Sequence, residues 1–157
     1  MRQALFAGTF DPPTLGHLEI IQRARHLCDR LIIGIGVNSK KSNPLLSEEE
    51  RIAILTQETS SLENVEIVSF NQLVIDYAKT RGIDFLIRGI RSACDLEWEQ
   101  QMAMANHKLG GLDTFFLLAE KYPKISASLI RELASQKAPL TAFVPKQVET
   151  MLHSKLG

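Results

Sequence analysis

The chain has 157 residues, 45% of them hydrophobic and 23% charged, and its 18 Lys and Arg residues balance its 18 Asp and Glu residues. This length suits one domain, so we predict a single domain over residues 1–157. The zero net charge gives no global attraction to nucleic acid or to an anionic membrane, and we predict neither as a partner. A small anionic substrate is compatible with this zero net charge, because a few local cationic side chains suffice to bind a small anion.

The cysteine pattern indicates a reducing compartment. Cys28 and Cys94 form no CxxC pair, no zinc-binding spacing and no disulfide framework. The N-terminal sequence MRQALFAGTF has too short an apolar run for a signal peptide, and no segment approaches the roughly 20 apolar residues of a membrane span. We therefore expect a cytoplasmic protein.

In the first half of the chain, the predicted elements are strand 4–8, helix 15–29, strand 30–38 and helix 48–58. The second strand is almost continuously apolar, which is typical of buried parallel strands. Ser47 and Glu50 form a capping-box pattern, which predicts a helix that begins directly after Ser47.

In the second half, the predicted elements are strand 65–70, helix 72–81, strand 84–89, helix 93–109, strand 114–119, helix 126–136 and a short terminal helix, 145–156. Gly82 has the position of a helix C-cap. Strands and helices that alternate through short loops predict an α/β fold, a Rossmann-like doubly wound five-stranded parallel sheet with helices on both faces. Such sheets bind ligands at the carboxyl ends of their strands.

The segment AGTFDPPTLGH follows the first predicted strand. His17 falls in the first turn of the next helix, where free N–H groups favour a negatively charged ligand, and Thr14 is placed to face the same side. Thr9 and Phe10 offer a hydroxyl and backbone N–H groups at the strand end. The segment predicts a phosphate-binding loop that carries a histidine. A tight turn with a capping histidine is the structural alternative.

Basic or hydroxyl side chains follow three further predicted strands. The loop NSKKSNP offers a lysine that could reach a phosphate, although two lysines in a polar loop are also typical of solvated surface. Arg88 and Arg91 flank the end of the next strand, where a guanidinium suits a phosphate; the alternative is an ion-pair network with Asp95 and Glu99. The last motif, KISASLIREL, places serines at a helix N-terminus.

All four motifs should meet at one edge of the sheet, because each follows a parallel strand. The convergent site would hold a histidine, lysines, arginines and hydroxyl groups, without a metal-ligand cluster or paired acids. Such a site suits a polyanion, and phosphoryl or nucleotidyl transfer is the chemistry that it fits best.

The motif TLGH (residues 14–17) resembles the (H/T)xGH signature of the nucleotidyltransferase superfamily that includes the class I aminoacyl-tRNA synthetases, and ISASLIR (residues 125–131) resembles its ISSSxxR-type motif. Within that superfamily, GTFDPPTLGHLEII, RGIRSACDLEWEQQMAMAN and the total length are similar to the bacterial phosphopantetheine adenylyltransferases, over essentially the whole chain.

This resemblance implies that the adenylyl group of ATP passes to 4′-phosphopantetheine, giving dephospho-coenzyme A and pyrophosphate, the penultimate step of coenzyme A synthesis. It implies direct attack on the α-phosphorus without a covalent enzyme intermediate. It also implies Mg²⁺ as the cofactor, carried by the ATP phosphates with no metal site on the protein, and a homohexameric assembly.

The resemblance also implies residue roles, transferred here onto the matching positions. The residues implied in catalysis are His17, Lys41 and Arg91. Those implied in phosphopantetheine binding are Thr9, Lys41, Val74 and Arg88. Those implied in ATP binding are Thr9, Phe10, His17, Gly89, Ile90, Arg91, Glu99, Tyr122, Pro123, Lys124, Ile125, Ser126, Ala127 and Ser128.

Three features depart from the family pattern. Ala7 replaces the usual proline before the first glycine, and Ala127 replaces the middle serine of ISSS, so one triphosphate contact is lost or made by backbone. The lysine loop is one residue longer than usual, so Lys41 is the expected active-site lysine and Lys40 its competitor.

Two alternative functions share parts of this pattern. GTFDPPxxGH is also typical of nicotinate or nicotinamide mononucleotide adenylyltransferases, but those are longer and generally carry His where this chain has Thr14. A non-catalytic nucleotide-binding or regulatory protein on the same fold would be indicated by loss of His17 or of the loop lysines, and both are present.

Overall fold

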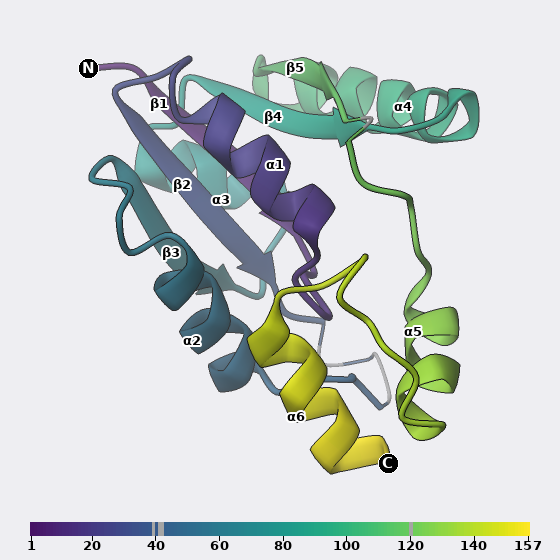
Figure 1. The fold of residues 1–157 in the computed structure, drawn as a ribbon. Helices are drawn as coiled ribbons and strands as arrows, with labels where there is room; N and C mark the ends of the chain where they lie inside the picture. Colours follow the sequence, from purple (N-terminus) through teal and green to yellow (C-terminus); the bar gives the residue numbers. More distant parts are fainter. Residues whose placement is uncertain (39, 41–42, 120) are drawn as a thin grey trace.

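The computed structural model describes the whole chain except residues 39, 41–42 and 120. Its centre is a five-stranded sheet with the strand order β3-β2-β1-β4-β5, and every pairing is parallel (Figure 1). The strands are β1 (Gln3–Gly8), β2 (Arg30–Gly36), β3 (Val65–Phe70), β4 (Phe85–Ile90) and β5 (Asp113–Leu118).

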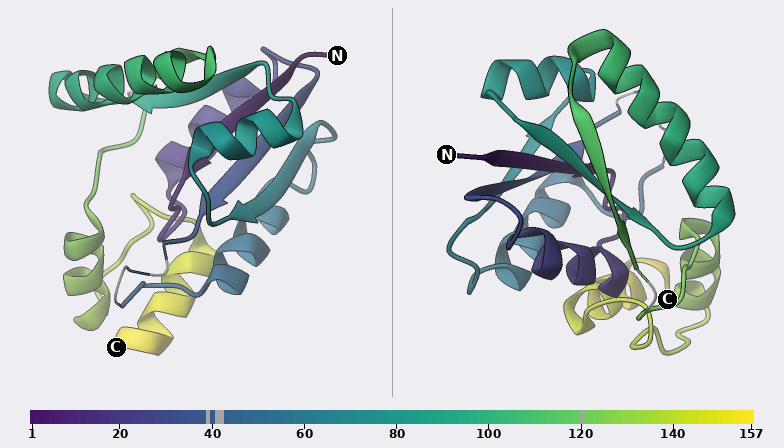
Figure 2. Two further views of the ribbon diagram at one scale, coloured as in Figure 1. Left: turned by 180° about the vertical axis from the view of Figure 1, so that it is seen from behind. Right: turned by 90° about the horizontal axis from the view of Figure 1, so that it is seen from above.

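Helices cover both faces of the sheet, as the sequence predicts. The helices are α1 (Leu15–Ala24), α2 (Glu48–Glu58), α3 (Val74–Arg81), α4 (Ala93–Gly110), α5 (Ala127–Ser135) and α6 (Lys146–Leu156). Helices α1 and α2 lie on one face and α3 on the other, while α5 and α6 pack together beyond the carboxyl ends of the strands (Figures 1 and 2). None of the described helices is long and apolar enough to cross a membrane.

Local sequence signals account for several helix ends. Ser47 and Glu50 form the expected capping box at the start of α2, and Gly82 ends α3 in the left-handed conformation. The predicted helix 15–29 is too long, because α1 ends at Ala24. The side-chain amide of Asn64 binds the carbonyl groups of Arg25 and Cys28, which turns the chain into β2.

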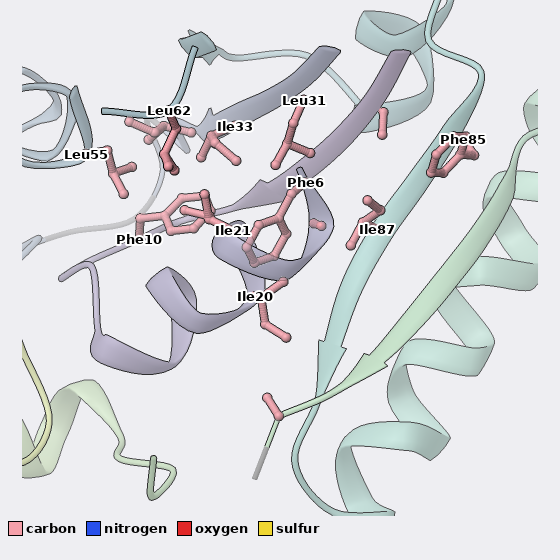
Figure 3. Close-up of a cluster of buried hydrophobic side chains, with 14 residues drawn as sticks. Phe6, Phe10, Ile20, Ile21, Leu31, Ile33, Leu55, Leu62, Phe85 and Ile87 are labelled. Carbon is pink, nitrogen blue, oxygen red and sulfur yellow. The ribbon is translucent and has the colours of Figure 1, made fainter. Parts of the chain in front are cut away.

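The main core lies between the sheet and helices α1 and α2. Figure 3 shows the rings of Phe6 and Phe10 between β1 and α1, and their centroids are 5.4 Å apart in an edge-to-face arrangement. Each fully buried side chain of this size contributes about 1.5–3 kcal/mol relative to exposure. This core fixes the start of α1 against the end of β1.

The sheet opens between β1 and β4 at the carboxyl edge. Strand β1 pairs with β2 along six residues but with β4 only from Ala4 to Phe6. The order of the strands reverses at β1, and open α/β sheets bind ligands at such a switch point. Gly89 of β4 lies close under α1, since a Cβ there would come within 2.9 Å of Ile20.

Candidate active site

His17 is held by the N-terminal cap of α1. Thr14 is the N-cap: its hydroxyl accepts the His17 N–H at 3.3 Å, and its own N–H donates to Nδ1 of His17 at 3.0 Å. The rings of His17 and Phe10 lie edge to face, with centroids 4.8 Å apart. Because Nδ1 accepts a hydrogen bond, the neutral imidazole carries its proton on Nε2.

The surroundings of His17 keep it neutral. Burial, followed by the charges of Arg91 and Arg88, lowers the pKa of His17 to about 3. At neutral pH the ring therefore offers a neutral Nε2–H donor rather than a basic nitrogen. A donor of this kind suits the stabilisation of negative charge on a phosphate.

Arg91 lies against the first turn of α1. A Cβ on Gly16 would come within 2.1 Å of Nη2 of Arg91, so glycine lets the guanidinium occupy this place without a shift. The guanidinium thus adds its charge to the positive end of the α1 dipole. This concentration of positive potential favours an anion at the same place.

Arg88 and Glu99 form a bidentate ion pair. Nε of Arg88 donates to Oε2 of Glu99 at 2.8 Å, and Nη2 donates to Oε1 at 2.6 Å. Nη1 donates to the carbonyl of Ala7 where β1 and β4 have stopped pairing. These bonds use three of the five guanidinium N–H groups, which leaves donors for a ligand.

A second ion pair joins α4 to the segment that follows β5. Asp95 binds Lys124 and also accepts the backbone N–H of Arg91 at 3.2 Å. Burial acts to raise the pKa of Asp95, but the hydrogen bonds from Lys124 and Arg91 outweigh it and hold the pKa below its ordinary value. Asp95 is therefore ionised at neutral pH, and it fixes the Lys124 side chain and the backbone of Arg91.

These side chains surround two adjacent pockets that share Ala7, Arg88 and Glu99. The polar pocket, about 210 Å³, is also lined by Phe6, Gly8, Thr9, Phe10, His17, Ile20, Gly89, Arg91, Asp95 and Lys124. The apolar pocket, about 110 Å³, is also lined by Leu5, Val74, Leu86, Ile87, Trp98, Met102, Ala103, Asn106 and Thr114. A polar cavity thus continues into an apolar one across the Arg88–Glu99 pair.

Most of the predicted site residues lie at these pockets. The polar pocket brings together Thr9, Phe10, His17, Arg88, Gly89, Arg91, Glu99 and Lys124, and Val74 lines the apolar pocket. Lys41 lies outside the described residues. Lys40 is described and exposed, with its N–H bound to the side chain of Asn38.

The remaining predicted ATP contacts lie elsewhere. Ile90 is buried, and its carbonyl accepts the N–H of Ala119. Tyr122 lines a third pocket beside α1, with Leu18 among its neighbours. The other five, none of which lines any of the three pockets, are Pro123, Ile125, Ser126, Ala127 and Ser128. The Ser126 hydroxyl caps α5.

Two residues behind the site were not predicted from the sequence. The Asp11 carboxylate accepts the N–H groups of Leu45 and Leu46 at 3.0 and 2.8 Å, which ties the segment before α2 to the loop after β1. Arg51 of α2 is buried and binds the Thr9 carbonyl. A signal for Arg51 was present, since it shares the apolar face of α2 with Ile54 and Leu55.

The acidic groups of the site are Asp95 and Glu99. Among the described residues, no group of three His, Cys, Asp or Glu side chains is placed to hold a metal ion. Asp95 and Glu99 line the polar pocket, but Lys124 and Arg88 already engage their carboxylates. Carboxylate oxygens are ligands that Mg²⁺ accepts, so Asp95 and Glu99 are the acidic groups of this pocket that could approach such an ion.

The strand order, the pocket at the switch point and the cationic and N–H donors that suit a phosphate define an α/β nucleotidyltransferase. The family model for cytidylyltransferase-like proteins matches residues 5–133. Three similar proteins bear the name phosphopantetheine adenylyltransferase. The protein of Lachnoclostridium phytofermentans is 40% identical over 157 residues, covering 99% of this chain and 96% of its own.

The protein of Rhizorhabdus wittichii is 41% identical over 150 residues, with 94% of this chain and 90% of its own length covered. That of Dinoroseobacter shibae is 43% identical over 164 residues, with 100% and 95% covered. The chain belongs to the phosphopantetheine adenylyltransferase family. The mononucleotide adenylyltransferase alternative is not favoured by these relatives.

Proposed function

We propose that the protein transfers the adenylyl group of ATP to 4′-phosphopantetheine and releases dephospho-coenzyme A and pyrophosphate. The observation that carries this proposal is the continuity of the polar and apolar pockets across Arg88. An acceptor with a phosphate at one end and an extended arm of hydrocarbon segments joined by amide groups matches that pair of cavities. The reaction is the penultimate step of coenzyme A synthesis.

The acceptor spans both pockets in this proposal. Its phosphate lies near Thr9 and binds the Arg88 donors that Glu99 leaves free, and its arm extends along Val74. Asn106 supplies an amide for the polar groups of the arm. The rest of this cavity is mostly apolar, which favours the hydrocarbon portions of the arm.

The chemical step is an in-line displacement. An oxygen of the acceptor phosphate forms a bond to the α-phosphorus of ATP as the bond to pyrophosphate breaks. The protein's part is to position the reactants and to stabilise charge. His17 donates its Nε2–H to an α-phosphate oxygen, and Arg91 lies beside the same helix N-terminus. Lys41 is proposed to bridge the attacking phosphate and ATP.

The rest of ATP lies toward the segment between β5 and α5. In this proposal residues 122–128 contact ATP, with Ser126 and Ser128 facing the β- and γ-phosphates near the N-terminus of α5. Ala127 has no hydroxyl, so its contact is made through the backbone N–H. The free N–H groups of a helix N-terminus favour such an anion.

Mg²⁺ is the proposed cofactor. Bound to the triphosphate, it would neutralise charge on the leaving pyrophosphate. Asp95 and Glu99 are the nearest acidic groups in the polar pocket, and both serve to fix cationic side chains. The protein therefore meets the metal through the nucleotide.

We also propose a homohexamer that works in the cytoplasm. Helix α4 and the edge strand β5 expose large apolar side chains, which supports association between copies; they are Leu96, Trp98, Met102, Met104, Leu109, Phe115 and Leu118. Cys28 and Cys94 are free thiols, which suits a reducing compartment. The mass of the purified protein by light scattering tests the assembly.

Pyrophosphate release tests the activity. We expect turnover with ATP and 4′-phosphopantetheine, and none with ATP and pantetheine, because the latter lacks the attacking phosphate. Nicotinate mononucleotide serves as the competing acceptor. Turnover with the mononucleotide alone contradicts the proposed function.

A further inference from the structure

Arg51 of α2 is a buried cation without an acidic partner. It is 7% exposed, and none of the ion pairs between described residues includes it. Instead, Nη1 donates to the Thr9 carbonyl at 2.9 Å and Nε donates to the Ser47 carbonyl at 3.2 Å. Buried arginines are ordinarily paired with a charge, so this arrangement indicates a specific use of the guanidinium.

The bond to Thr9 sets the direction of a backbone N–H. The peptide between Thr9 and Phe10 is trans, so its C=O and N–H point in opposite directions. Helix α2 contacts β2 and β3 on one side of β1, whereas Arg88 and Arg91 lie on the β4 side. With the Thr9 carbonyl aimed at Arg51, the Phe10 N–H is aimed at the polar pocket.

This N–H has no acceptor among the residues that the structure describes, although the side chain of Phe10 is fully buried. Both Thr9 and Phe10 line the polar pocket. The N–H is therefore a preformed donor at the place where His17 and Arg91 also gather. Such donors stabilise developing negative charge when their orientation is fixed in advance.

The conformation of Phe10 shows why the orientation needs support. Its φ is 49°, in the left-handed region that residues with a side chain disfavour. Turning the Thr9–Phe10 peptide over would return φ to the common extended region. It would also aim the Thr9 carbonyl oxygen at the pocket, where it would repel a phosphate. The hydrogen bond from Arg51 opposes this rotation.

We propose that Arg51 is a positioning residue that holds the Phe10 N–H toward a phosphate oxygen of the nucleotide. Asp11 makes a second connection between the loop after β1 and the start of α2, because its carboxylate accepts the N–H groups of Leu45 and Leu46. The inference rests on the proposed function only in taking a nucleotide phosphate as the ligand. Arg51 acts through Phe10 and need not touch the substrate.

Kinetics of two variants give the first test. Arg51→Met removes the donors and the charge, and we expect kcat/KM for ATP to fall by about 10- to 100-fold, with kcat also reduced. This loss is smaller than for removal of an oriented donor itself, because the Phe10 N–H is still present. Arg51→Lys restores a cation with a donor and should recover part of the loss. Arg81→Met is the matched control, because Arg81 binds Glu66 near the amino end of β3, and neither residue lines the polar pocket.

Arg81→Met should leave kcat unchanged. Circular dichroism and the thermal midpoint identify variants that fold. Equal kcat for Arg51→Met and the wild type overturns the inference, as does an equal loss in Arg81→Met.

An amide resonance gives the second test, which requires no turnover. The wild-type protein is labelled with ¹⁵N-phenylalanine, and the Phe10 signal is assigned from its loss in Phe10→Leu. ATP or inorganic pyrophosphate, added without an acceptor, should shift this signal in the wild type. The shift should be reduced in Arg51→Lys and absent in Arg51→Met if that variant folds.

The two proposals fail in different ways. An unshifted Phe10 signal in the wild type overturns the role of Arg51, even when 4′-phosphopantetheine is turned over normally. A clear shift without turnover of 4′-phosphopantetheine contradicts the proposed function and leaves the role of Arg51 standing.

Discussion

The backbone N–H of Thr14 donates to Nδ1 of His17 at 3.0 Å, and this one bond gives the histidine two roles. It closes the capping box of α1, and it leaves the proton of the neutral ring on Nε2, as donor to a ligand. The two roles are separable, because glutamine in this position of a capping box also accepts the N–H of the cap residue.

We therefore expect different results from two substitutions of His17. His17→Ala loses both roles. Its kcat should fall about 100- to 1,000-fold, as for removal of a charge-stabilising donor. Its free energy of unfolding should fall by about 1 kcal/mol, as for loss of a cap. His17→Gln should keep near wild-type stability while kcat stays low. Steady-state kinetics and urea unfolding measure both, and wild-type kcat in His17→Ala, which has no donor at all, would remove Nε2 from the chemistry.

The low pKa of His17 predicts how activity responds to pH. With a pKa of about 3 in the folded protein, the ring stays neutral throughout the pH range in which enzymes are ordinarily assayed. The profile of kcat against pH should show no acidic limb from His17 between about pH 5 and 8. A limb near pH 6.5 that disappears in His17→Gln contradicts this assignment.

The same pKa also predicts how stability responds to pH. Its value is about 3 when folded against 6.5 for the model group, so the unfolded chain binds more protons between these values. The contribution of His17 is fully present above pH 6.5 and is lost as the pH falls toward 3. Urea unfolding at several pH values should show the wild type losing more stability on acidification than His17→Gln.

The sequence was sufficient for features that depend on neighbours along the chain. The capping box of Ser47 and Glu50 and the left-handed cap at Gly82 were both predicted and are both present. The gathering of motifs at one edge was also predictable, because parallel strands place their carboxyl ends together. For that reason His17, Arg88 and Arg91 meet in one pocket as expected.

Contacts between distant segments were not predictable in the same way. The turn after α1 depends on Asn64, which lies 39 residues beyond the carbonyl of Arg25 that it binds. Arg51 is 42 residues from Thr9. The ion pair of Arg88 and Glu99 was only an alternative in the sequence, because spacing cannot show which of several charges will meet.

The Arg88–Glu99 pair predicts an asymmetry in stability. The Glu99 side chain is 10% exposed and that of Arg88 is 36% exposed. Arg88→Met therefore leaves a buried carboxylate alone, which costs about 3 kcal/mol, whereas Glu99→Gln leaves a guanidinium that reaches water and should cost less. Urea unfolding at neutral pH measures both, and the opposite order contradicts the burial argument. Arg88→Met/Glu99→Met should be more stable than Arg88→Met alone.

Gly16 provides a test in which stability and activity move in opposite directions. Alanine is a better helix residue than glycine by about 1 kcal/mol, so Gly16→Ala should fold normally. Its Cβ, however, would lie 2.1 Å from Nη2 of Arg91, so that guanidinium must shift from its place beside the helix N-terminus. We expect kcat/KM for ATP to fall by about tenfold or more, since a small misplacement of a charge-stabilising group is costly.

Gly82→Ala is the matched control for Gly16→Ala. A Cβ at Gly82 meets nothing within 4 Å, but its φ of 64° strains any other residue. This variant should lose about 1 kcal/mol of stability and keep wild-type kcat/KM. Kinetics and urea unfolding of both variants separate displacement of Arg91 from a general loss of stability. Loss of kcat/KM in Gly82→Ala as well would show that lowered stability alone reduces activity, and would contradict the role given to Arg91.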